Sequence, residues 1–578
     1  MCGIFGITHF DRSSLDKARE ALHTLSHRGP DQWNEYIDEN IYLGHRRLSI
    51  LDLSIQGMQP MYNEDKSILI IVNGEIYNFQ ELKKELSLKH QFKSTSDSEV
   101  ILHGYKEWGI DILLEKIDGM YAFSIYDKTK KKLFLARDRV GIKPLYYSTI
   151  GDQITFASEL KAIQHFYNSH SLKIDYTALY DFLTYRYIPA PKTMYHNVYK
   201  LEPGHYLEIR LDDNSIKDVQ YWKLEINSCN DSIEEACVKI YELVKKSVDE
   251  QMMSDVPVGF FLSGGIDSST VVTMASKIKS NISTFSIGFT DKNYDETHFA
   301  DIIAEKLKTN HHKKILAEDL TKKLLPEIRS WYDEPFADFS CFPTFLVSEY
   351  AKEIVTVVLT GDGGDEVFGG YTWYKRFSEK SKFRYPSLSF LRLFLKPFSN
   401  QNNILSKISR KIENPFLLDD LELYTKLMSG SIQSEKIDYR DKWDIPKDYD
   451  DYWYFRKYYR EELDILTRLQ YLDFHTFLPD DILTKVDRVS MAVSLECRVP
   501  LLSKEIVEYL FSLPSEIRFY NNELKGAMKK AFQDEIPKDI LHREKKGFSI
   551  PLQTWREELM ENPQNPRRFV LDEIFNFS

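Results

Sequence analysis

A short apolar run that leads into a glycine-rich loop constrains the fold of this chain more than any other feature. Residues 258–262 predict a buried strand, residues 263–269 read Ser-Gly-Gly-Ile-Asp-Ser-Ser, and a helix is predicted to begin at Thr270. A strand, a glycine-rich turn and a helix N-terminus together form an anion site from backbone N–H groups and the helix dipole. Because Ser and Gly also cap ordinary helices, the argument depends on the preceding strand and the full SGGxDSS pattern.

Two further strand-and-loop units indicate a parallel sheet. The run 282–287 ends at Gly288, and the run 355–359 leads into residues 360–366 (TGDGGDE). Parallel strands whose carboxyl-end loops converge form a nucleotide crevice. Three carboxylates within this acidic loop would repel one another without a cation, which predicts Mg²⁺ held together with phosphate oxygens. A solvated loop is the alternative, and a Walker loop is excluded because its lysine is absent.

The second residue of the chain is a candidate nucleophile. Removal of Met1 would give Cys2 a free α-amine, whose ordinary pKa of about 8 lets it act as a base near neutral pH. A thiol beside its own amine needs no histidine to be activated. The alternative is a small apolar residue that only packs, as most free cysteines do.

Several polar segments accompany Cys2 in the first third of the chain. They are residues 27–31 (HRGPD), 44–50 (GHRRLSI) and 73–78 (NGEIYN). The run 67–72 predicts a buried strand, and Asn73-Gly74 predicts a turn that closes it. Such a turn can aim a backbone N–H and an amide at one point, as an oxyanion hole requires; a plain hairpin is the alternative. Asp97 opens a predicted helix over 97–108, where a simple helix cap is the alternative.

Together these segments resemble the class II glutamine amidotransferases, whose nucleophile is the amino-terminal residue. The resemblance covers residues 1–165 and includes IDGMYAFSIYD, RDRVGIKPLYY and FASELKAI. It implies that Cys2 attacks the side-chain amide of glutamine to give a γ-glutamyl thioester, while its α-amine moves the proton. It also implies that Asn73 and Gly74 hold the oxyanion.

The same resemblance implies a pocket for the rest of the glutamine molecule. Arg47 would pair with the α-carboxylate, a bidentate task suited to a guanidinium, and Glu75 and Asp97 would hold the α-ammonium. The backbone after Arg47 would complete the pocket, through Leu48, Ser49, Ile50 and Leu51. One departure is Gln32, which follows the HRGPD segment where such enzymes usually have glycine; we expect it to alter a loop and not the chemistry.

Over residues 1–555 the chain resembles the glutamine-hydrolysing asparagine synthetases. Further matching stretches are YDEPFADFSCFPTFL, LPDDILTKVDRVSMAVSLECRVPLL and LHREKKGFSIP. The resemblance implies an ATP site made by Phe261, Leu262, Ser263, Gly264, Gly265, Asp267, Ser268, Ser269, Ile287, Thr360 and Gly361. It also implies that Asp267 and Asp365 hold Mg²⁺.

Two further residues have implied roles in the chemistry. Asp362 would lie near the acceptor and support adenylate formation, although many synthetases carry glutamate there. Lys545 would stabilise charge as ammonia attacks; an exposed residue in the basic run 543–546 is the alternative. Glu496 and Arg498 would help to shape the interior, since a buried charge needs a partner.

The implied reaction has two halves. The acceptor carboxylate attacks the α-phosphorus of ATP, which gives an acyl-adenylate and pyrophosphate, and AMP is then a good leaving group. Glutamine hydrolysis must supply NH₃, because NH₄⁺ cannot attack. We therefore expect a route shielded from water between the two sites.

Aspartate is the expected acceptor. Two departures keep another carboxylate, such as a sugar acid in surface-glycan synthesis, as the alternative. Ser503 stands where such synthetases usually have Asp after Pro-Leu-Leu, and the chain ends soon after Trp555. A non-catalytic binding relative is a third hypothesis, against which the intact Cys2 and the two glycine-rich loops argue.

The predicted fold is α/β with two domains. Residues 1–205 are expected to form a four-layer αββα Ntn-hydrolase-type glutaminase domain. Residues 206–578 are expected to form a Rossmann-like parallel-sheet ATP-pyrophosphatase domain with extra helices.

Two local patterns lie at the junction of these domains. Alternating apolar and polar residues over 195–225, around Pro203-Gly204, predict hairpins. Residues 231–253 predict a helix that starts with a capping box at Ser232-x-x-Glu235 and places Cys237 in the core.

Composition excludes several classes. The net charge of −12 disfavours non-specific nucleic-acid binding, and no apolar run approaches the roughly 18 residues that a membrane span needs. The first residues lack the features of a secretory signal, and the five cysteines show no metal or disulfide spacing. We therefore expect a cytoplasmic enzyme with reduced thiols, with homodimerisation left open. Residues 373–411 hold ten Lys or Arg, and we expect a solvated helix face, with a membrane-surface helix as the alternative.

Overall fold

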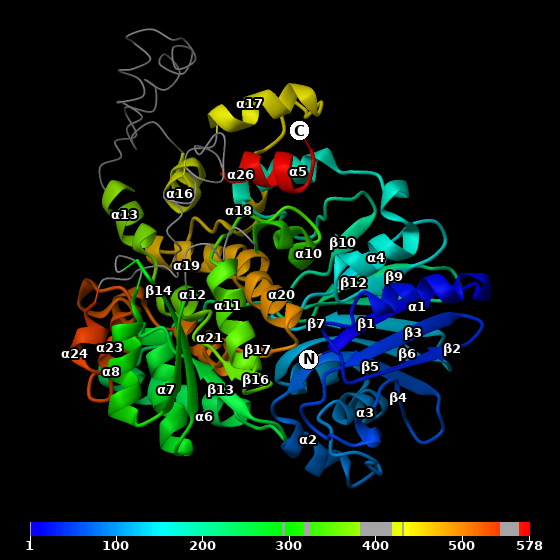
Figure 1. The fold of residues 1–578 in the computed structure, drawn as a ribbon, viewed down its shortest axis with the longest axis horizontal. Helices are drawn as coiled ribbons and strands as arrows, with labels where there is room; N and C mark the ends of the chain where they lie inside the picture. The colour runs from blue at the N-terminus through cyan, green and yellow to red at the C-terminus, as the bar shows by residue number, and fades with distance from the viewer. Residues whose placement is uncertain are drawn as a thin grey trace.

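Two antiparallel six-stranded sheets lie face to face in the amino-terminal part of the protein (Figure 1). The structure, a computed structural model, describes residues 2–291, 295–316, 324–381, 419–430, 433–543 and 566–577. The first sheet has the strand order β10 (Val198–Lys200), β8 (Tyr146–Ser148), β9 (Thr155–Ala157), β1 (Cys2–Thr8), β3 (Ile41–Arg47), β2 (Gln32–Ile37). The second has the order β12 (Ile216–Gln220), β11 (His205–Arg210), β7 (Lys132–Arg137), β6 (Gly119–Asp127), β5 (Ile68–Ile76), β4 (Met61–Tyr62).

Alternation of side chains along the strands produces the layers. On β1, Ile4 packs between the sheets with Leu69 and Ala122, whereas Phe5 points to the opposite face. Two helices cover that outer face, α1 (Leu15–His23) and α4 (Leu160–Tyr167); two others cover the second sheet, α2 (Phe79–Leu86) and α3 (Glu99–Lys116). The predicted four-layer αββα arrangement is confirmed.

The segment that starts at Asn73 is not a turn. Asn73 and Gly74 lie within β5 and pair with β6, and the strand ends only at Ile76. A Cβ at Gly74 would lie 2.1 Å from the Met120 carbonyl oxygen, so glycine allows the two strands to approach. The predicted turn is wrong because continuous pairing with β6 overrides the local Asn-Gly preference. The predicted helix after Asp97 is α3, which continues past a kink at Gly109.

Strands β10, β11 and β12 form the connector between the two parts. β10 pairs with β8 of the first sheet, and β11 pairs with β7 and β12 of the second. The predicted hairpin is therefore β11–β12, while Pro203-Gly204 carries the chain from one sheet to the other. Hydrogen-bonded pairing continues to Gln220, and the domain boundary between residues 205 and 206 stays a prediction.

A five-stranded parallel sheet lies in the carboxyl-terminal part (Figure 1). Its strand order is β15 (Asn310–Leu316), β14 (Ser283–Phe289), β13 (Val258–Phe261), β16 (Val357–Leu359), β17 (Glu496–Arg498). The chain leaves β13 toward β14 and later returns on the other side of β13 with β16. Strand order thus reverses between β13 and β16, the position where open α/β sheets bind ligands. The predicted parallel-sheet domain is confirmed.

Two helices flank β13 in the sequence. The predicted helix before it is α6 (Ile233–Gln251), with the capping box at Ser232 and Glu235. Cys237 is only half-buried, because the buried stripe of α6 runs through Ala236 and Ile240 instead. The helix after β13 is α7 (Ile266–Ile278), which begins before the predicted Thr270, so Asp267, Ser268 and Ser269 belong to its first turn.

The other described helices lie around this sheet or near the amino-terminal layers (Figure 1). They are α5 (Tyr176–Tyr185), α8 (Thr297–Leu307), α10 (Ile328–Tyr332), α11 (Cys341–Lys352), α12 (Gly364–Phe368), α13 (Thr372–Ser381), α16 (Asp420–Ser429), α17 (Gln433–Lys442), α18 (Trp453–Tyr458), α19 (Ile465–His475), α20 (Thr484–Ala492), α21 (Lys504–Ser512), α22 (Ser515–Arg518), α23 (Gly526–Ala531), α24 (Lys538–Leu541) and α26 (Pro566–Phe569). Over the described ranges, no helix is long and apolar enough to cross a membrane.

The basic segment 373–411 is described only as far as Ser381. There α13 buries Tyr374 and Phe377 and exposes Lys375 and Arg376, as a solvated face over a packed helix requires. The apolar run 388–395 lies outside the described residues.

Candidate active sites

Cys2 lies at the start of β1, directly across from Arg47 of β3. Its side chain is 7% exposed, and its backbone N–H donates to Asn73 Oδ1 at 3.0 Å. Burial raises the pKa of the Cys2 thiol, although a hydrogen bond from the Leu48 backbone opposes this. The buried Nδ2 of Asn73 has no hydrogen-bond partner among the described residues. A buried amide donor without a partner, next to a thiol, is suited to receive an oxyanion.

The Arg47 side chain is 4% exposed, and its Nη atoms are held by neighbouring oxygens. Nη1 donates to Ser54 O and to Gln32 Oε1, both at 2.9 Å, and Nη2 donates to Leu51 O at 3.2 Å. Gln32 belongs to strand β2 and pairs with Arg47 in register. The expectation that the departure at Gln32 alters a loop is therefore wrong, because Gln32 lies in a strand, whereas the expectation that it leaves the chemistry unchanged stays a prediction.

The segment after Arg47 contacts the carboxyl-terminal part of the chain. Leu48 and Ile50 lie in one hydrophobic cluster with residues of β13, and Ile50 O accepts a hydrogen bond from Asp255 N at 3.0 Å. The Ser49 N–H donates to Asp31 Oδ2 at 2.8 Å. Hydrogen bonds with the amino-terminal part, through Asp31, and with the carboxyl-terminal part, through Asp255, thus fix the backbone predicted to line the glutamine pocket.

Glu75 and Asp97 are two buried carboxyl groups near the same place. Burial raises the pKa of Glu75 well above its usual range, and the charge of Asp97 raises it further. Burial also raises the pKa of Asp97, whose Oδ2 accepts a hydrogen bond from Ile76 N at 2.7 Å. Arg498 reaches across from β17, with its Nη2 3.4 Å from Glu75 Oε1. This cluster of carboxyl groups favours the arrival of a further cation.

The loops after β13 and β16 meet at the switch point of the parallel sheet. A Cβ on Gly361 would lie 2.7 Å from Ser268 N, so glycine allows the loops to touch. Gly264 has a φ of +68°, a conformation that favours glycine, and the Ser263 N–H donates to Ser268 Oγ at 3.3 Å. The N-terminus of α7 therefore lies where these two loops meet.

The other residues predicted around ATP lie at the same sheet edge. Phe261 and Leu262 end β13 and Ile287 lies near the end of β14, with Leu262 N donating to Phe285 O at 2.9 Å. Thr360 follows β16, and its N–H donates to Arg498 O at 2.9 Å.

Lys525 lies between the two predicted metal ligands. Its Nζ is 2.5 Å from Asp267 Oδ2 and 2.6 Å from Asp365 Oδ1, and the residue is 5% exposed. Its backbone φ of +57° is rare for a residue other than glycine, which marks a position fixed by its surroundings. The two carboxylates supply oxygen donors of the kind that Mg²⁺ accepts together with phosphate oxygens, and in this structure the ammonium of Lys525 lies between them.

Asp362 is half-buried beside a cationic side chain from α20. Burial raises the pKa of Asp362, and the charge of Lys485 opposes that shift. Lys485 Nζ is 3.2 Å from Asp338 Oδ2 and 2.8 Å from Ser340 Oγ. Lys545 lies outside the described residues.

Comparisons with known proteins match both parts of the chain. A family model described as glutamine amidotransferase domain matches residues 1–222, and the asparagine synthase model matches residues 239–572. Asparagine synthetase [glutamine-hydrolyzing] 1 of Bacillus subtilis (strain 168) is 35% identical, over 97% of this chain and 88% of its own length. The chain belongs to the asparagine synthetase family. A putative asparagine synthetase 2 of Methanocaldococcus jannaschii is 38% identical, over 85% of this chain and 98% of its own length.

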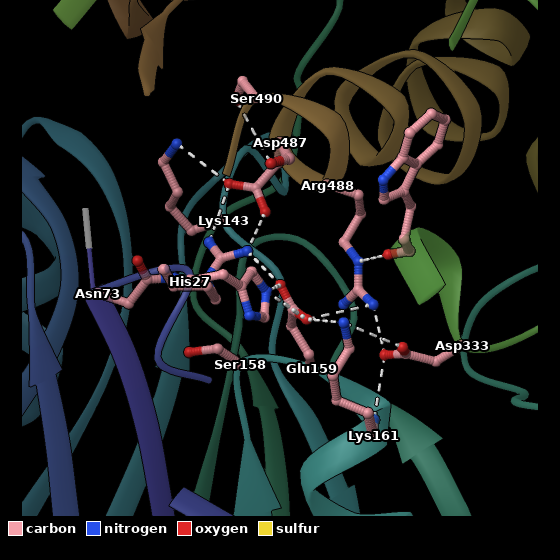
Figure 2. A network of polar contacts seen from close by, with 12 residues as sticks. His27, Asn73, Lys143, Ser158, Glu159, Lys161, Asp333, Asp487, Arg488 and Ser490 are labelled. Atoms are coloured by element: carbon pink, nitrogen blue, oxygen red, sulfur yellow. Dashed lines mark hydrogen bonds and ion pairs between the residues drawn. The ribbon is translucent and has the colours of Figure 1, made fainter. Parts of the chain in front are cut away.

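In this member of the asparagine synthetase family, buried ion pairs join the two parts (Figure 2). Arg28 Nε donates to Cys2 O at 3.1 Å, and its Nη1 lies 2.8 Å from both Glu159 Oε1 and Asp487 Oδ2. Lys143 Nζ is 3.5 Å from Asp487 Oδ1. The backbone of Cys2 is thus tied to α20 of the synthetase part through a single guanidinium.

A second arginine extends this network (Figure 2). Arg488 Nη2 contacts Asp333 and lies 3.4 Å from Glu159 Oε2, while Lys161 bridges Glu159 at 3.0 Å and Asp333 at 3.4 Å. Sequence reasoning assigned no role to Arg28, Arg488 or Lys525. Both arginines lie in stretches that match the family, so the sequence could have identified them as candidates. Nothing in the local sequence distinguishes Lys525.

Proposed function

We propose that this protein is a glutamine-dependent asparagine synthetase. ATP activates the side-chain carboxylate of aspartate as an acyl-adenylate, and ammonia from glutamine hydrolysis at Cys2 forms the amide. The observation that carries the proposal is that one chain combines two features. Cys2 lies beside Asn73, whose Nδ2 has no hydrogen-bond partner among the described residues, and a Ser-Gly-Gly loop lies at the switch point of a parallel sheet. The names of the relatives support aspartate as the acceptor.

The glutaminase half uses Cys2 Sγ to attack the side-chain amide of glutamine. Asn73 Nδ2 and the Gly74 N–H stabilise the oxyanion, ammonia leaves, and water hydrolyses the thioester. Arg47 receives the α-carboxylate of glutamine, and the backbone of residues 48–51 closes the pocket. The α-ammonium binds Glu75 and Asp97, because a cation there relieves two carboxyl groups that burial otherwise disfavours in their charged form.

In the synthetase half, a carboxylate oxygen of the acceptor attacks the α-phosphorus of ATP and pyrophosphate leaves. Ammonia then attacks the acyl carbon and AMP leaves. The ATP site is formed by Phe261, Leu262, Ser263, Gly264, Gly265, Asp267, Ser268, Ser269, Ile287, Thr360 and Gly361. Asp362 lies toward the acceptor, and Lys545 stabilises charge as ammonia attacks.

Asp267 and Asp365 would hold Mg²⁺, which supplies neutralising charge to the phosphates. Lys525 adds a fixed positive charge beside both carboxylates. We further propose a cytoplasmic enzyme divided near residue 205, with small molecules rather than nucleic acid or membrane as its partners.

The acceptor is tested by pyrophosphate release from ATP with ammonia as the nitrogen source. Aspartate, glutamate, a uronic acid and buffer alone form the panel. We expect release with aspartate that exceeds release with each of the others. If aspartate gives no more than buffer, aspartate is not the acceptor.

The two-site mechanism is tested by Cys2→Ala. This change removes the nucleophile of the glutaminase half and leaves the ATP crevice intact. Glutamine-dependent synthesis should vanish while ammonia-dependent synthesis continues at the rate of the parent protein. Loss of both activities in a folded variant contradicts the mechanism.

A further inference from the structure

We propose that Glu64, His90 and His103 form a binding site for a divalent transition metal of the Zn²⁺ type. These residues come from the turn after β4, the segment after α2, and α3. One potential ligand atom of each lies within 4.8 Å of the others. None of the three belongs to the glutamine pocket or the ATP crevice, so the site does not depend on the proposed function.

His103 is oriented as a metal ligand. Its Nε2 lies 3.3 Å from Glu99 Oε1, and Glu99 is itself fixed by the backbone N–H groups of Lys93 and Ser94, both at 2.8 Å. A carboxylate at one ring nitrogen favours the tautomer whose other nitrogen carries a free lone pair. That other nitrogen, Nδ1, has no hydrogen-bond partner within the described part of the chain and points toward Glu64 Oε1 at 3.9 Å. The His103 side chain is 2% exposed.

His90 lies beside the same Glu64 carboxylate, and its Nε2 forms no hydrogen bond with the described residues. Its Nε2 lies 3.4 Å from Glu107 Oε2, and its Nδ1 lies 3.6 Å from Glu64 Oε1. The rings of His90 and His103 are stacked, with centroids 4.9 Å apart and planes inclined by 26°. Two imidazoles, of which that of His103 is hydrogen-bonded to a carboxylate at Nε2, therefore place their Nδ1 atoms near one carboxylate oxygen.

The third ligand is available and the donor set is selective. Lys106 Nζ pairs with Glu64 Oε2 at 2.9 Å, which leaves Oε1 to the histidines. Two imidazole nitrogens and one carboxylate oxygen suit Zn²⁺ and its neighbours, whereas Mg²⁺ and Ca²⁺ prefer oxygen alone. The Glu64 side chain is 37% exposed, so a metal can enter from solvent. Bonds of about 2.0–2.2 Å would draw the three groups closer together.

A metal here would stiffen a segment that forms part of the wall of the proposed glutamine pocket. His90 and His103 flank the segment 91–102, which carries Asp97, and Glu99 anchors the start of that segment. Joining α3 to the turn after β4 would hold Asp97 against Ile76 more rigidly. The inferred role is therefore structural, with its effect on the wall of the pocket.

The test uses the full chain, stripped with chelator and supplied with excess Mg²⁺, in a Cys2→Ala background so that this thiol does not compete. CoCl₂ titration followed by visible absorption should give one equivalent of bound Co²⁺, displaced by ZnCl₂. His90→Gln and His103→Gln should each weaken Co²⁺ binding by at least about 100-fold, and Glu99→Gln by about 10–100-fold. His205→Gln is the control, because His205 pairs with Asp218 at 2.7 Å and should leave binding unchanged.

Zn²⁺ should also raise the thermal unfolding temperature of the parent and not that of the histidine variants. If a histidine variant fails to fold, Glu64→Gln replaces it, since this more exposed change leaves the core intact and should still weaken binding. Two results would overturn the proposal. One is a parent that gives no cobalt spectrum, and the other is a folded His90→Gln/His103→Gln variant with the affinity of the parent.

Discussion

At the scale of single residues, the two candidate sites balance their polar groups in opposite ways. The Cys2 pocket keeps a buried amide donor, Asn73 Nδ2, without a partner among the described residues. The candidate ATP site instead surrounds the ammonium of Lys525 with the carboxylates of Asp267 and Asp365. The first site can therefore receive a negative charge, whereas in the second site a lysine already neutralises part of the negative charge of the carboxylates.

Asn73→Ala removes the donor proposed for the oxyanion. We expect the glutaminase kcat to fall by about 10²–10³, the loss typical of one missing oxyanion donor. Asn73→Asp keeps the oxygen that accepts from Cys2 N but not the donor, so it should lose as much. Ammonia-dependent pyrophosphate release is the control and should not change. If the Asn73→Asp variant kept the glutaminase activity of the parent, the Asn73 amide donor would have no part in the reaction.

Lys525→Met leaves Asp267 and Asp365 without the cation between them. We expect ATP-dependent synthesis with ammonia to fall by about 10²-fold, since a fixed charge at the phosphates is lost, while glutaminase activity stays. Lys529→Met is the matched control. Lys529 lies on α23, the helix for which Lys525 is the N-cap residue, and its Nζ pairs with Glu523 at 2.8 Å. Equal losses in the two variants would contradict the assignment.

At the scale of elements, short loops decide where these side chains lie. A Cβ on Gly370 would lie 1.9 Å from Asp365 Oδ1 and 2.2 Å from Lys525 Cε. Both atoms belong to side chains that can move, so the site is more sensitive to this position than the fold is.

Gly370→Ala should therefore destabilise the protein by only about 1–3 kcal/mol, the usual cost of overpacking. Ammonia-dependent synthesis should fall much further, because the added methyl group displaces the Asp365–Lys525 pair. Thermal unfolding and pyrophosphate release measure the two effects. A variant that loses stability but keeps its synthetase rate would show that the Asp365–Lys525 pair can shift without a loss of ammonia-dependent synthesis.

The sequence predicted elements well where the signal was local, and poorly where a distant strand decided the outcome. The capping box of α6 lies where the pattern predicted it, because all of its hydrogen bonds lie within the first turn. Asn73-Gly74 did not form the predicted turn, because pairing with β6 extends the strand. Lys525 was missed since its partner Asp267 is 258 positions away and no local pattern connects them.

At the scale of the whole molecule, buried charges connect the two parts. Arg28 binds the Cys2 carbonyl on one side and Asp487 of α20 on the other. Burial alone would raise the pKa of Asp487, but Arg28 and Lys143 together hold it below its usual value.

Asp487→Asn breaks this network on one side. The loss of one partner from a buried ion pair costs about 3–5 kcal/mol, so we expect a clearly lower unfolding temperature near neutral pH. A carboxylate with a lowered pKa contributes its stability in full above the usual value of about 4 and loses it as the pH falls further. The parent should therefore lose stability in acid more steeply than the variant does.

Asp218→Asn is the control for that experiment, because Asp218 forms an exposed pair with His205 and should cost about 0–1 kcal/mol. Glutamine consumed per amide formed is the second measurement. We expect more glutamine to be consumed per amide formed in Asp487→Asn but not in Asp218→Asn. If Asp487→Asn changes neither the stability nor this ratio, the network does not connect the two parts functionally.

The three-residue strand β17 has a consequence for exchanging the two halves between relatives. Arg498 Nη1 donates to the carbonyl groups of Gln251 and Met253, both at 2.7 Å, while its Nη2 faces Glu75. A chimera that combines this synthetase half with a foreign glutaminase half would place that guanidinium against an unmatched surface. Grafts within the family should therefore succeed only when the residue at position 75 and the strand 496–498 are moved as one unit.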